Sequence, residues 1–333
     1  MLEKTKEYRK ELADNFIHAL EEKQLDWKKE WNGKSAAPVN VKSGAKYKGI
    51  NRFRLMMVAM QRHYEDPRWA TFHQIAEMGY KLKDAKGQGV KVEYWFPYDR
   101  NERHVISWDD FYKFTNGTPN ERYILSARYS VVFNGSLVEG LPELSEGERN
   151  DIAVDELVTT LSKNMQVEII HNENDRAFYK PSEDKIYLPS PELFHSDYSY
   201  NATALHELAH ATGAPTRLNR NMSGRFGTPE YAYEELIAEI SSCFMSENLK
   251  VEQGQEHIDN HKAYVQSWIK EIKEKPETLV KAISEAEKVT TFMEYHAGLI
   301  PQKEYEKVVN SSIEVERPQP IPKKTLVAKG PKM

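Results

Sequence analysis

The residues best suited to do chemistry lie in the stretch ALHELAHAT, residues 204–212. His206 and His210 are four positions apart, so on a helix both imidazoles project from one face and can bind a single metal ion. Glu207 directly follows the first histidine, where its carboxylate can take a proton from a water that the metal activates. The spacing therefore predicts a metal site with a hydrolytic base beside it.

An ordinary helix that happens to carry two histidines is the alternative to a metal site. Leu205, Leu208 and Ala209 surround the pair with apolar positions, as a buried catalytic helix requires. Gly213 follows as a natural helix stop. This context favours metal binding over a solvated helix face.

The expected metal needs a further protein ligand, because a catalytic zinc site uses three and keeps one position open for water. A third histidine at position 216 would supply it, but that residue is Thr216. The helix expected over 230–248 offers Glu234, Glu235 and Glu239 instead. Glu235 and Glu239 share a face, so we expect Glu235 to bind the metal and Glu239 to accept a hydrogen bond from a ligand histidine. Glu234 is the alternative ligand, and a run of surface glutamates is the alternative without function.

The loop between these two helices, residues 213–230, is rich in glycine and carries three arginines. Arg217, Arg220 and Arg225 could bind a substrate anion or a nucleic-acid phosphate. A solvated loop is the alternative for all three.

Apolar periodicity predicts the elements that must position these side chains. In the second half, strands are expected over 167–171, 176–179 and 185–189 (KIYLP), and helices over 150–164, 201–212, 230–248, 256–273 and 276–297. In the first half, helices are expected over 3–30, 52–63 and 71–80, a strand pair over 81–99 with its turn at Gly87–Gly89, and a strand over 128–136. The sequence thus predicts an α+β protein of two domains, the second mainly helical with a small antiparallel sheet.

Composition places the domain boundaries. A chain of 333 residues is comfortable for two domains. The acidic, turn-rich stretch 137–149 is expected to be a linker between a first domain over 1–136 and a second over 150–300. Residues 301–333 hold five prolines and many lysines with little apolar content, which predicts a flexible tail.

Cysteine and hydropathy indicate the compartment. Cys243 is the only cysteine, so no intramolecular disulfide can form, which fits a reducing cytoplasm. No apolar run approaches membrane-spanning length, and the charged N-terminus lacks the apolar core of a secretion signal. We therefore expect a cytoplasmic location and no membrane partner.

Charge and aromatic content set the first half apart. Residues 1–134 carry 24 Lys and Arg against 18 Asp and Glu, whereas residues 135–300 carry 15 against 29. A basic half with many aromatic side chains suits single-stranded DNA, because bases stack on rings while cations follow the phosphates. The best candidate is the glycine-rich segment KSGAKYKGINRFR, with contacts expected from Lys42, Lys46, Tyr47, Lys48, Asn51, Arg52 and Arg54. The alternative is that most of the aromatic residues form a core.

The order of motifs along the chain resembles the ArdC-type antirestriction proteins of plasmids and other mobile elements. The motifs that carry the resemblance are PVNVKSGAKYKGIN (38–51), DPRWATFHQIAEMG (66–79), YSVVFNGSLVEGLP (129–142), FYKPSEDKIYLPSPELF (178–194), ALHELAHATG (204–213), RLNR (217–220) and FGTPEYAYEELIAEI (226–240). The resemblance implies an N-terminal domain that binds single-stranded DNA and a C-terminal zincin-like metallopeptidase domain. It also implies a role in protecting DNA that enters a new host from restriction.

Two hypotheses from different classes follow. The first is an antirestriction-type protein that binds single-stranded DNA and carries a zinc-dependent peptidase-like site with one Zn²⁺, or another divalent metal such as Mn²⁺. The second is a DNA-binding and shielding protein whose metal site is structural or idle. Whether proteolysis occurs, which peptide or protein would be its substrate, and whether double-stranded DNA is also bound stay open at this point.

Overall fold

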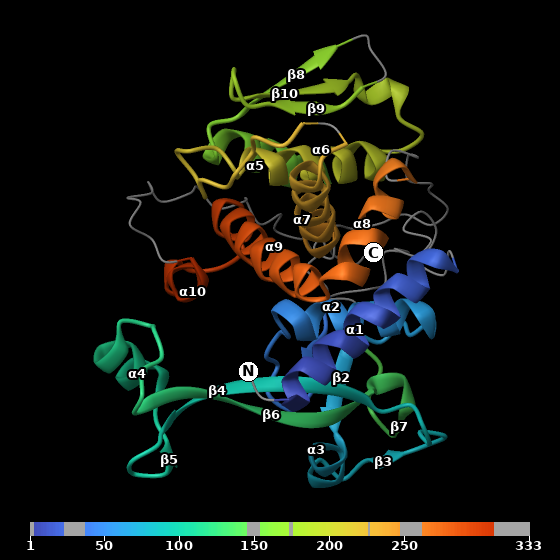
Figure 1. The fold of residues 1–333 in the computed structure, drawn as a ribbon. Helices are drawn as coiled ribbons and strands as arrows, with labels where there is room; N and C mark the ends of the chain where they lie inside the picture. Colours follow the sequence, from blue (N-terminus) through green and yellow to red (C-terminus); the bar gives the residue numbers. More distant parts are fainter. Residues whose placement is uncertain are drawn as a thin grey trace, which may run out of the picture. The chain divides into compact units, whose positions relative to one another are not determined.

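The computed structural model describes residues 3–22, 37–144, 154–172, 176–225, 227–246 and 262–309. The chain divides into two compact units, one formed by Met1–Leu25 with Lys34–Glu148 and the other by Asp26–Gly33 with Arg149–Met333. Each combines helices with strands (Figure 1), which confirms the predicted α+β protein of two domains. Within the described ranges, no helix is both long and apolar enough to cross a bilayer.

The first unit is built around a five-stranded sheet of order β1-β2-β6-β4-β5. Its two long strands, β4 (Val90–Asp99) and β6 (Tyr123–Asn134), pair antiparallel from Val90 opposite Val132 to Asp99 opposite Tyr123. Strand β2 (Arg68–Thr71) pairs antiparallel with β6 and parallel with β1 (Val39–Asn40), and β5 (His104–Val105) pairs with β4. The helices of this unit are α1 (Glu3–Glu21), α2 (Gly49–Gln61), α3 (Phe72–Glu77) and α4 (Trp108–Thr115).

Side chains alternate between the two faces of β4, and each face packs on a different helix. Val90 and Val92 form a core with Leu55 of α2, Trp69 and Val132. On the other face, Arg9 of α1 forms an ion pair with Glu93, and its guanidinium lies 5.7 Å from the centre of the Trp95 ring. Leu12, Phe16, Ile17 and Leu20 of α1 are buried, as their helical spacing predicts.

The strand pair expected over 81–99 does not form. Strand β3 (Lys81–Leu82) pairs instead with β7 (Val138–Glu139), while β4 pairs with β6. The turn between residues 82 and 90 therefore joins strands of two different sheets. Because β7 lies in the stretch that we expected to be a linker, the first unit continues beyond residue 136.

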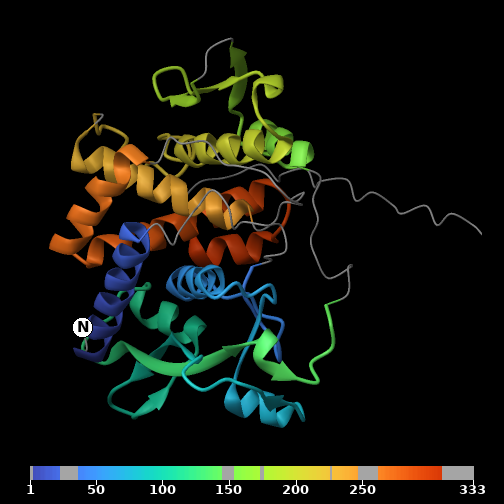
Figure 2. The same ribbon diagram turned by 90° about the vertical axis from the view of Figure 1, so that its right-hand side faces the viewer.

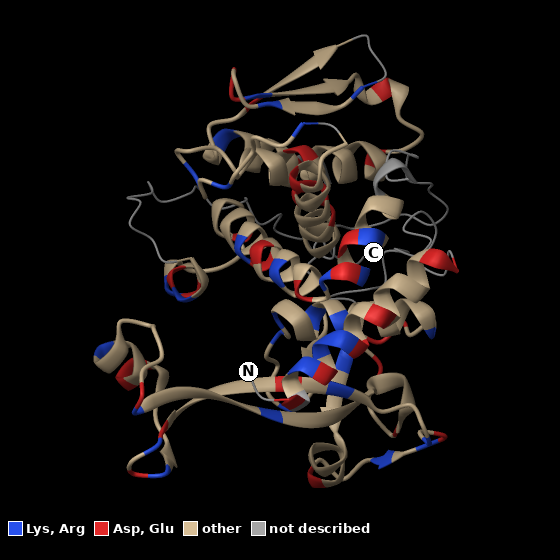
Figure 3. Cartoon of the chain, viewed as in Figure 1, with Lys and Arg blue, Asp and Glu red and all other residues tan. Residues whose placement is uncertain are grey.

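The second unit consists of a three-stranded sheet, the helix that carries His206, Glu207 and His210, and further helices. The sheet lies on one side of α6 (Asp197–Ala211), and α7 (Pro229–Ser246) packs on another side of α6, an arrangement that both views show (Figures 1 and 2). Helix α7 packs in turn on α9 (Glu277–His296) and α8 (Lys262–Glu274), and α5 (Val154–Asn164) packs on α6. Basic and acidic residues alternate along α9 (Figure 3), whose apolar residues other than Val280 are buried.

The small sheet is mixed, where we expected an antiparallel one. Strand β10 (Lys185–Pro189) pairs antiparallel with β9 (Phe178–Lys180) but parallel with β8 (Glu168–Asn172). The turn at residues 181–184 reverses the chain, so β10 pairs antiparallel with β9. On its other side β10 pairs with β8, which runs in the same direction as β10. KIYLP is therefore the central strand, and β9 is an edge strand.

The expected tail begins with ordered structure. Helix α10 (Gln302–Val308) buries Tyr305, whose ring stacks on Tyr295 of α9 with centroids 4.6 Å apart. A single buried aromatic residue thus fixes a segment whose overall composition is polar. Residues 310–333 lie outside the described ranges, as do Trp27 and Trp31 and the expected end of the first helix.

Candidate functional site

Helix α6 holds the HExxH motif in a buried position. The helix starts at a reciprocal cap in which the Ser196 side chain accepts from the Ser199 backbone N–H and the Ser199 side chain accepts from the Ser196 N–H. Leu205, Leu208 and Ala209 are fully buried, which fixes the rotation of the helix about its axis. That rotation directs the histidines of the motif toward α7.

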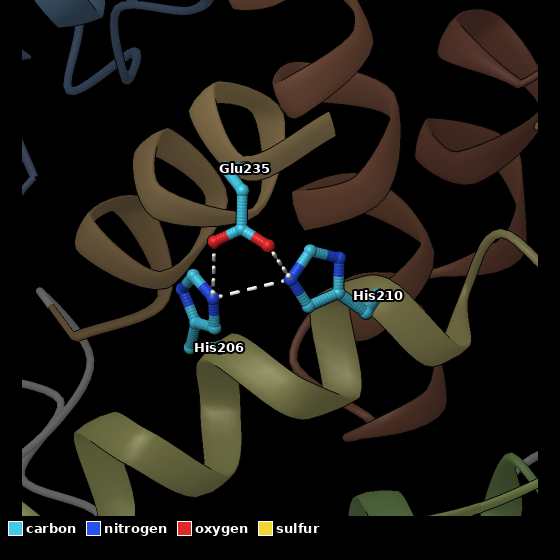
Figure 4. Close-up of side chains that lie close together, drawn as sticks. All are labelled: His206, His210 and Glu235. Atoms are coloured by element: carbon cyan, nitrogen blue, oxygen red, sulfur yellow. Dashed lines mark hydrogen bonds and ion pairs between the residues drawn. The ribbon is translucent and has the colours of Figure 1, made fainter. Parts of the chain in front are cut away.

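Three of the predicted site residues meet between α6 and α7. His206 and His210 project from α6 toward Glu235 of α7 (Figure 4). Their Nε2 atoms are 3.1 Å apart, and Glu235 oxygens lie 3.6 Å from Nε2 of His206 and 3.4 Å from Nε2 of His210. Tetrahedral zinc with bonds of about 2.0–2.1 Å separates its ligand atoms by about 3.4 Å. The separations in the structure therefore fit a small metal ion held by these three residues.

The Nδ1 atoms of the two histidines face two other carboxylates of α7. Glu239 Oε2 lies 3.4 Å from Nδ1 of His206, and Glu234 Oε1 lies 3.2 Å from Nδ1 of His210. A carboxylate in this position orients a ligand imidazole and makes it a better donor to a metal. The structure thus places Glu239 where we expected it and puts Glu234 in the corresponding position on the second histidine.

The role of Glu234 is one that the sequence did not reveal. Its carboxylate also receives hydrogen bonds from Arg220, with Nη2 at 2.5 Å and Nε at 3.1 Å. Arg220 in turn donates to Thr212 Oγ1 and to the carbonyl oxygen of Ala209. The loop arginine therefore ties Glu234 to the end of α6, and no periodic pattern in the sequence signals this contact.

The electrostatics of the site favour cations. Burial opposes charge on His210, but the carboxylates of Glu234 and Glu235 outweigh it and raise the pKa of His210 to about 9. Burial likewise opposes charge on Glu235, yet the two imidazoles hold its pKa well below the usual range. The same carboxylates favour a proton on His210 when no metal ion is bound. A metal ion that binds there replaces protons.

Glu207 lies on the sheet side of the site. Its side chain is buried, and Oε2 accepts a hydrogen bond of 2.7 Å from the backbone N–H of Tyr179 in β9. Because β9 is an edge strand, this backbone N–H points away from β10, its neighbour in the sheet. The Glu207 carboxylate is therefore held against the edge of β9 that does not face β10.

Two of the three loop arginines are used within the fold. Arg217 is buried, donates to the carbonyl oxygen of Ala211 and forms an ion pair with Asp184. Arg220 is bound to Glu234, as described above. Of the expected anion-binding residues only Arg225 is exposed. Neither alternative given for this loop, anion binding or a solvated loop, describes Arg217 and Arg220, because their guanidinium groups already bind acceptors within the fold.

Gly213 is needed for close packing after α6. A Cβ built on it would lie 2.5 Å from Sδ of Met222 and 3.1 Å from the carbonyl oxygen of His210. A side chain at residue 213 would therefore require Met222 to move and would press on the carbonyl oxygen of His210. The sequence indicated the helix stop but not this contact.

The expected DNA-binding segment is divided between core and surface. Arg52 and Arg54 are buried, and Arg54 pairs with Glu11 of α1. Asn51 forms hydrogen bonds with the backbone N–H and carbonyl oxygen of Glu93 along the edge of β4. These three side chains stabilise the first unit, so the expectation that they contact DNA is not supported by their position.

The remaining candidates of this segment lie in the loop before α2. Tyr47 is half-buried against the core around Trp69, and its hydroxyl accepts from Asn40. Lys42 forms an exposed ion pair with Glu77. Lys46 and Lys48 are exposed. Lys46 and Lys48 therefore have the exposure that the expected contact with a phosphate backbone requires.

Comparisons with known proteins identify both units. Residues 6–133 match the N-terminal domain of anti-restriction factor ArdC, and residues 156–285 match a zincin-like metallopeptidase domain. Two DNA primases TraC of Escherichia coli are 35% and 34% identical over 88% of this chain, which spans only 27% and 20% of their lengths. An uncharacterized protein y4eC of Sinorhizobium fredii is 29% identical over 85% of this chain and 90% of its own.

Solved structures give the same assignment. The metal-free crystal structure of antirestriction protein ArdC from plasmid R388 covers 88% of this chain and 99% of its own, at 28% identity and a TM-score of 0.67. The Mn(II)-bound crystal structure of the same protein matches at 27% identity and a TM-score of 0.64. With both domains present in the same order, the chain belongs to the ArdC-type antirestriction family, with an ArdC N-terminal domain followed by a zincin-like metallopeptidase domain.

Proposed function

We propose that the chain binds single-stranded DNA through its first unit and carries a zinc-dependent peptidase-like site in its second, in an antirestriction role. The convergence of His206, His210 and Glu235 beside Glu207 carries the proposal for the site. The family assignment, with the basic balance of the first half, carries the proposal for DNA. Zinc is the proposed metal because the donor set is two imidazoles and one carboxylate. The Mn(II)-bound relative makes manganese the alternative.

The chain's own residues would divide the work of hydrolysis as follows. Zinc at this site would polarise the scissile carbonyl and lower the pKa of a water molecule. Glu207 would take the proton from the attacking water and return it to the leaving amine nitrogen. Glu234 and Glu239 would hold the two imidazoles with Nε2 directed at the metal.

An extended peptide would align along β9, because the strand KIYLP has no free edge. Both edges of β10 are paired, with β8 and with β9. Strand β9 is next to Glu207 through the Tyr179 N–H. Adding a strand to β9 would bring a peptide carbonyl toward the base and the metal ligands.

One observation favours the second hypothesis, a DNA-shielding protein whose metal site is idle. The carboxylate of Glu207 is already bound by the Tyr179 N–H, so the base has a partner in the absence of any substrate. A site kept in this state would hold metal without turnover. The two hypotheses therefore differ in what the Glu207 carboxylate does and not in which residues bind the metal.

The variant Glu207→Gln separates these functions. Glutamine keeps an oxygen that can accept from the Tyr179 N–H but cannot take a proton, so metal content and folding should be unchanged. We expect hydrolysis of denatured casein by the zinc-loaded protein to vanish, while affinity for a labelled single-stranded oligonucleotide is kept. Hydrolysis that survives the change would refute Glu207 as the base. Loss of protection in a restriction assay would show that antirestriction needs the peptidase site, and full protection would support the shielding hypothesis.

A further inference from the structure

The antiparallel pair of β4 and β6 carries an aromatic surface that the core does not use. Tyr94 and Phe96 of β4 point to the same face as Val90 and Val92, because alternate residues of a strand share a face. Val90 and Val92 are buried, whereas the Tyr94 side chain is 62% exposed. We call Tyr94, Phe96 and Arg128 the aromatic face.

The two ends of the β4–β6 pair differ in burial because the core cluster ends at Val92. The cluster of Leu55 and Trp69 covers β4 only at Val90 and Val92 and covers β6 at Val132. Helix α1 packs on the opposite face of the β4–β6 pair, where its Tyr8 ring lies 5.3 Å from that of Tyr129. The aromatic face therefore lies beyond the packed core while its strands are held rigidly from the other side.

The geometry of the aromatic face suits flat ligands. The rings of Tyr94 and Phe96 are nearly parallel, with an interplanar angle of 23° and centroids 6.3 Å apart. Arg128 lies directly opposite Tyr94 in β6, and its guanidinium lies 5.2 Å from the centre of the Phe96 ring. Two aligned rings and a cation over one of them provide stacking surfaces together with a positive charge.

Charge indicates the class of partner. Arg128 is the only charged residue of β4 and β6 that shares this face, since Lys91, Glu93 and Asp99 alternate onto the other. Most residues of β4 and β6 are accordingly uncharged (Figure 3). Rings with a cation and no carboxylate fit a polyanion that has flat bases, and every base offers a face for stacking.

We propose that Tyr94, Phe96 and Arg128 form the base-stacking surface on which the first unit binds single-stranded DNA. The proposal rests on the proposed function, DNA binding by this unit, and names the residues that contact the bases. Bases stack on the Tyr94 and Phe96 rings, and Arg128 binds a phosphate or stacks on a base. Lys46 and Lys48 contact phosphates and are not part of this surface.

The test measures fluorescence anisotropy of a labelled oligo-dT with the full chain at fixed salt. Tyr94→Ala and Phe96→Ala should each weaken binding by roughly five- to hundredfold, the range for losing one stacked base. Phe72→Ala is the matched control, because Phe72 is 65% exposed on α3 of the same unit and lies outside the aromatic face. It should bind within about twofold of wild type, because it removes no proposed stacking partner. Tyr94→Trp, which keeps a ring at this position, should bind oligo-dT as wild type does and not as Tyr94→Ala does.

An oligonucleotide with abasic sites separates stacking from other effects. Wild type should bind the abasic strand more weakly than oligo-dT, and this difference should be smaller for Tyr94→Ala, which keeps only the Phe96 ring. Arg128→Gln should lower the slope of log affinity against log salt by up to about 0.7, the value for one phosphate contact on a single strand. Tyr94→Ala should leave that slope unchanged.

The outcomes distinguish this proposal from the function on which it rests. If wild type does not bind oligo-dT, DNA binding itself fails, and the aromatic face fails with it. If wild type binds but Tyr94→Ala and Phe96→Ala behave like Phe72→Ala, DNA binding stands and the aromatic face is refuted. Equal losses on intact and abasic strands would also refute it. Unchanged melting temperatures in circular dichroism would show that the variants are folded.

Discussion

Replacing Glu235 and Glu234 separately by glutamine tests which carboxylate of α7 binds the metal. Both side chains are buried and adjacent in sequence, and both contact His210. Glu235 faces the Nε2 atoms of both histidines, whereas Glu234 faces Nδ1 of His210 only. Glu235→Gln should therefore remove a ligand, and Glu234→Gln should remove only the support of one.

The expected sizes follow from these positions. Apparent zinc-binding free energies of about 10–16 kcal/mol spread over four ligands amount to about 2.5–4 kcal/mol per ligand, roughly a hundred- to thousandfold in affinity. Loss of a carboxylate that supports a ligand histidine costs about 10–100-fold. At a metal concentration of about 100 times the wild-type Kd, bound metal stabilises wild type by about 2.7 kcal/mol. The same concentration gives about 0.4–1.4 kcal/mol for Glu234→Gln and below about 0.4 kcal/mol for Glu235→Gln.

Differential scanning fluorimetry with and without Zn²⁺ or Mn²⁺ measures these differences within each variant. At about 2–4 °C per kcal/mol, the metal should raise the wild-type Tm by about 5–11 °C, that of Glu234→Gln by about 1–6 °C and that of Glu235→Gln by less than about 2 °C. Each variant is compared with its own metal-free form, so the change in Tm that comes from losing the ion pair alone cancels. A metal response that survives in Glu235→Gln and vanishes in Glu234→Gln would exchange the two roles and refute our assignment.

Four further predictions rest on the positions of other side chains. A metal ion must displace a proton from His210, whose pKa is about 9, so metal affinity should rise about tenfold per pH unit between pH 7 and 9 and level off above pH 9. Chelator competition at several pH values measures this affinity, and a flat profile would contradict the prediction. In the metal-free protein the same shift stabilises the fold fully below about pH 6.5 and not above pH 9, so denaturant midpoints should fall across that window. Combined Lys46→Ala and Lys48→Ala substitutions should lower the salt slope of DNA binding by about 1.4. Arg54→Ala, which removes a buried guanidinium and its ion pair with the exposed Glu11, should lower the Tm and leave the slope intact. A lower slope for Arg54→Ala with an unchanged slope for the lysine variant would show that Arg54 contacts DNA and the two lysines do not. Tyr305→Ala should destabilise the second unit by about 3–5 kcal/mol in urea unfolding, as for a buried aromatic residue, and no change would show that α10 adds nothing to stability.

Local patterns predicted the elements of the site well. The HExxH spacing and the periodicity of 230–248 depend only on neighbours along one helix, and both helices formed close to their expected bounds. The meeting of His206 and His210 with Glu235 required one further assumption, that zinc needs another ligand. Chemistry supplied that assumption where sequence periodicity could not.

Contacts between distant segments were not predictable in the same way. The pairing of β3 with β7 joins residues that are far apart in sequence, and nothing in either segment names its partner. The burial of Arg54 and Arg217 depends on Glu11 and Asp184, so cations that looked suited to phosphates became structural. A basic residue in a loop identifies a charge, but only the fold shows whether a carboxylate already binds it.

The most direct test of the metal centre is a crystal structure of the zinc-loaded protein with anomalous data at the zinc edge. We predict one strong peak at about 2.0–2.2 Å from Nε2 of His206, Nε2 of His210 and one carboxylate oxygen of Glu235. Glu234 and Glu239 should remain on the Nδ1 atoms. A peak bound by Glu234, or the absence of any peak between α6 and α7, would contradict the account.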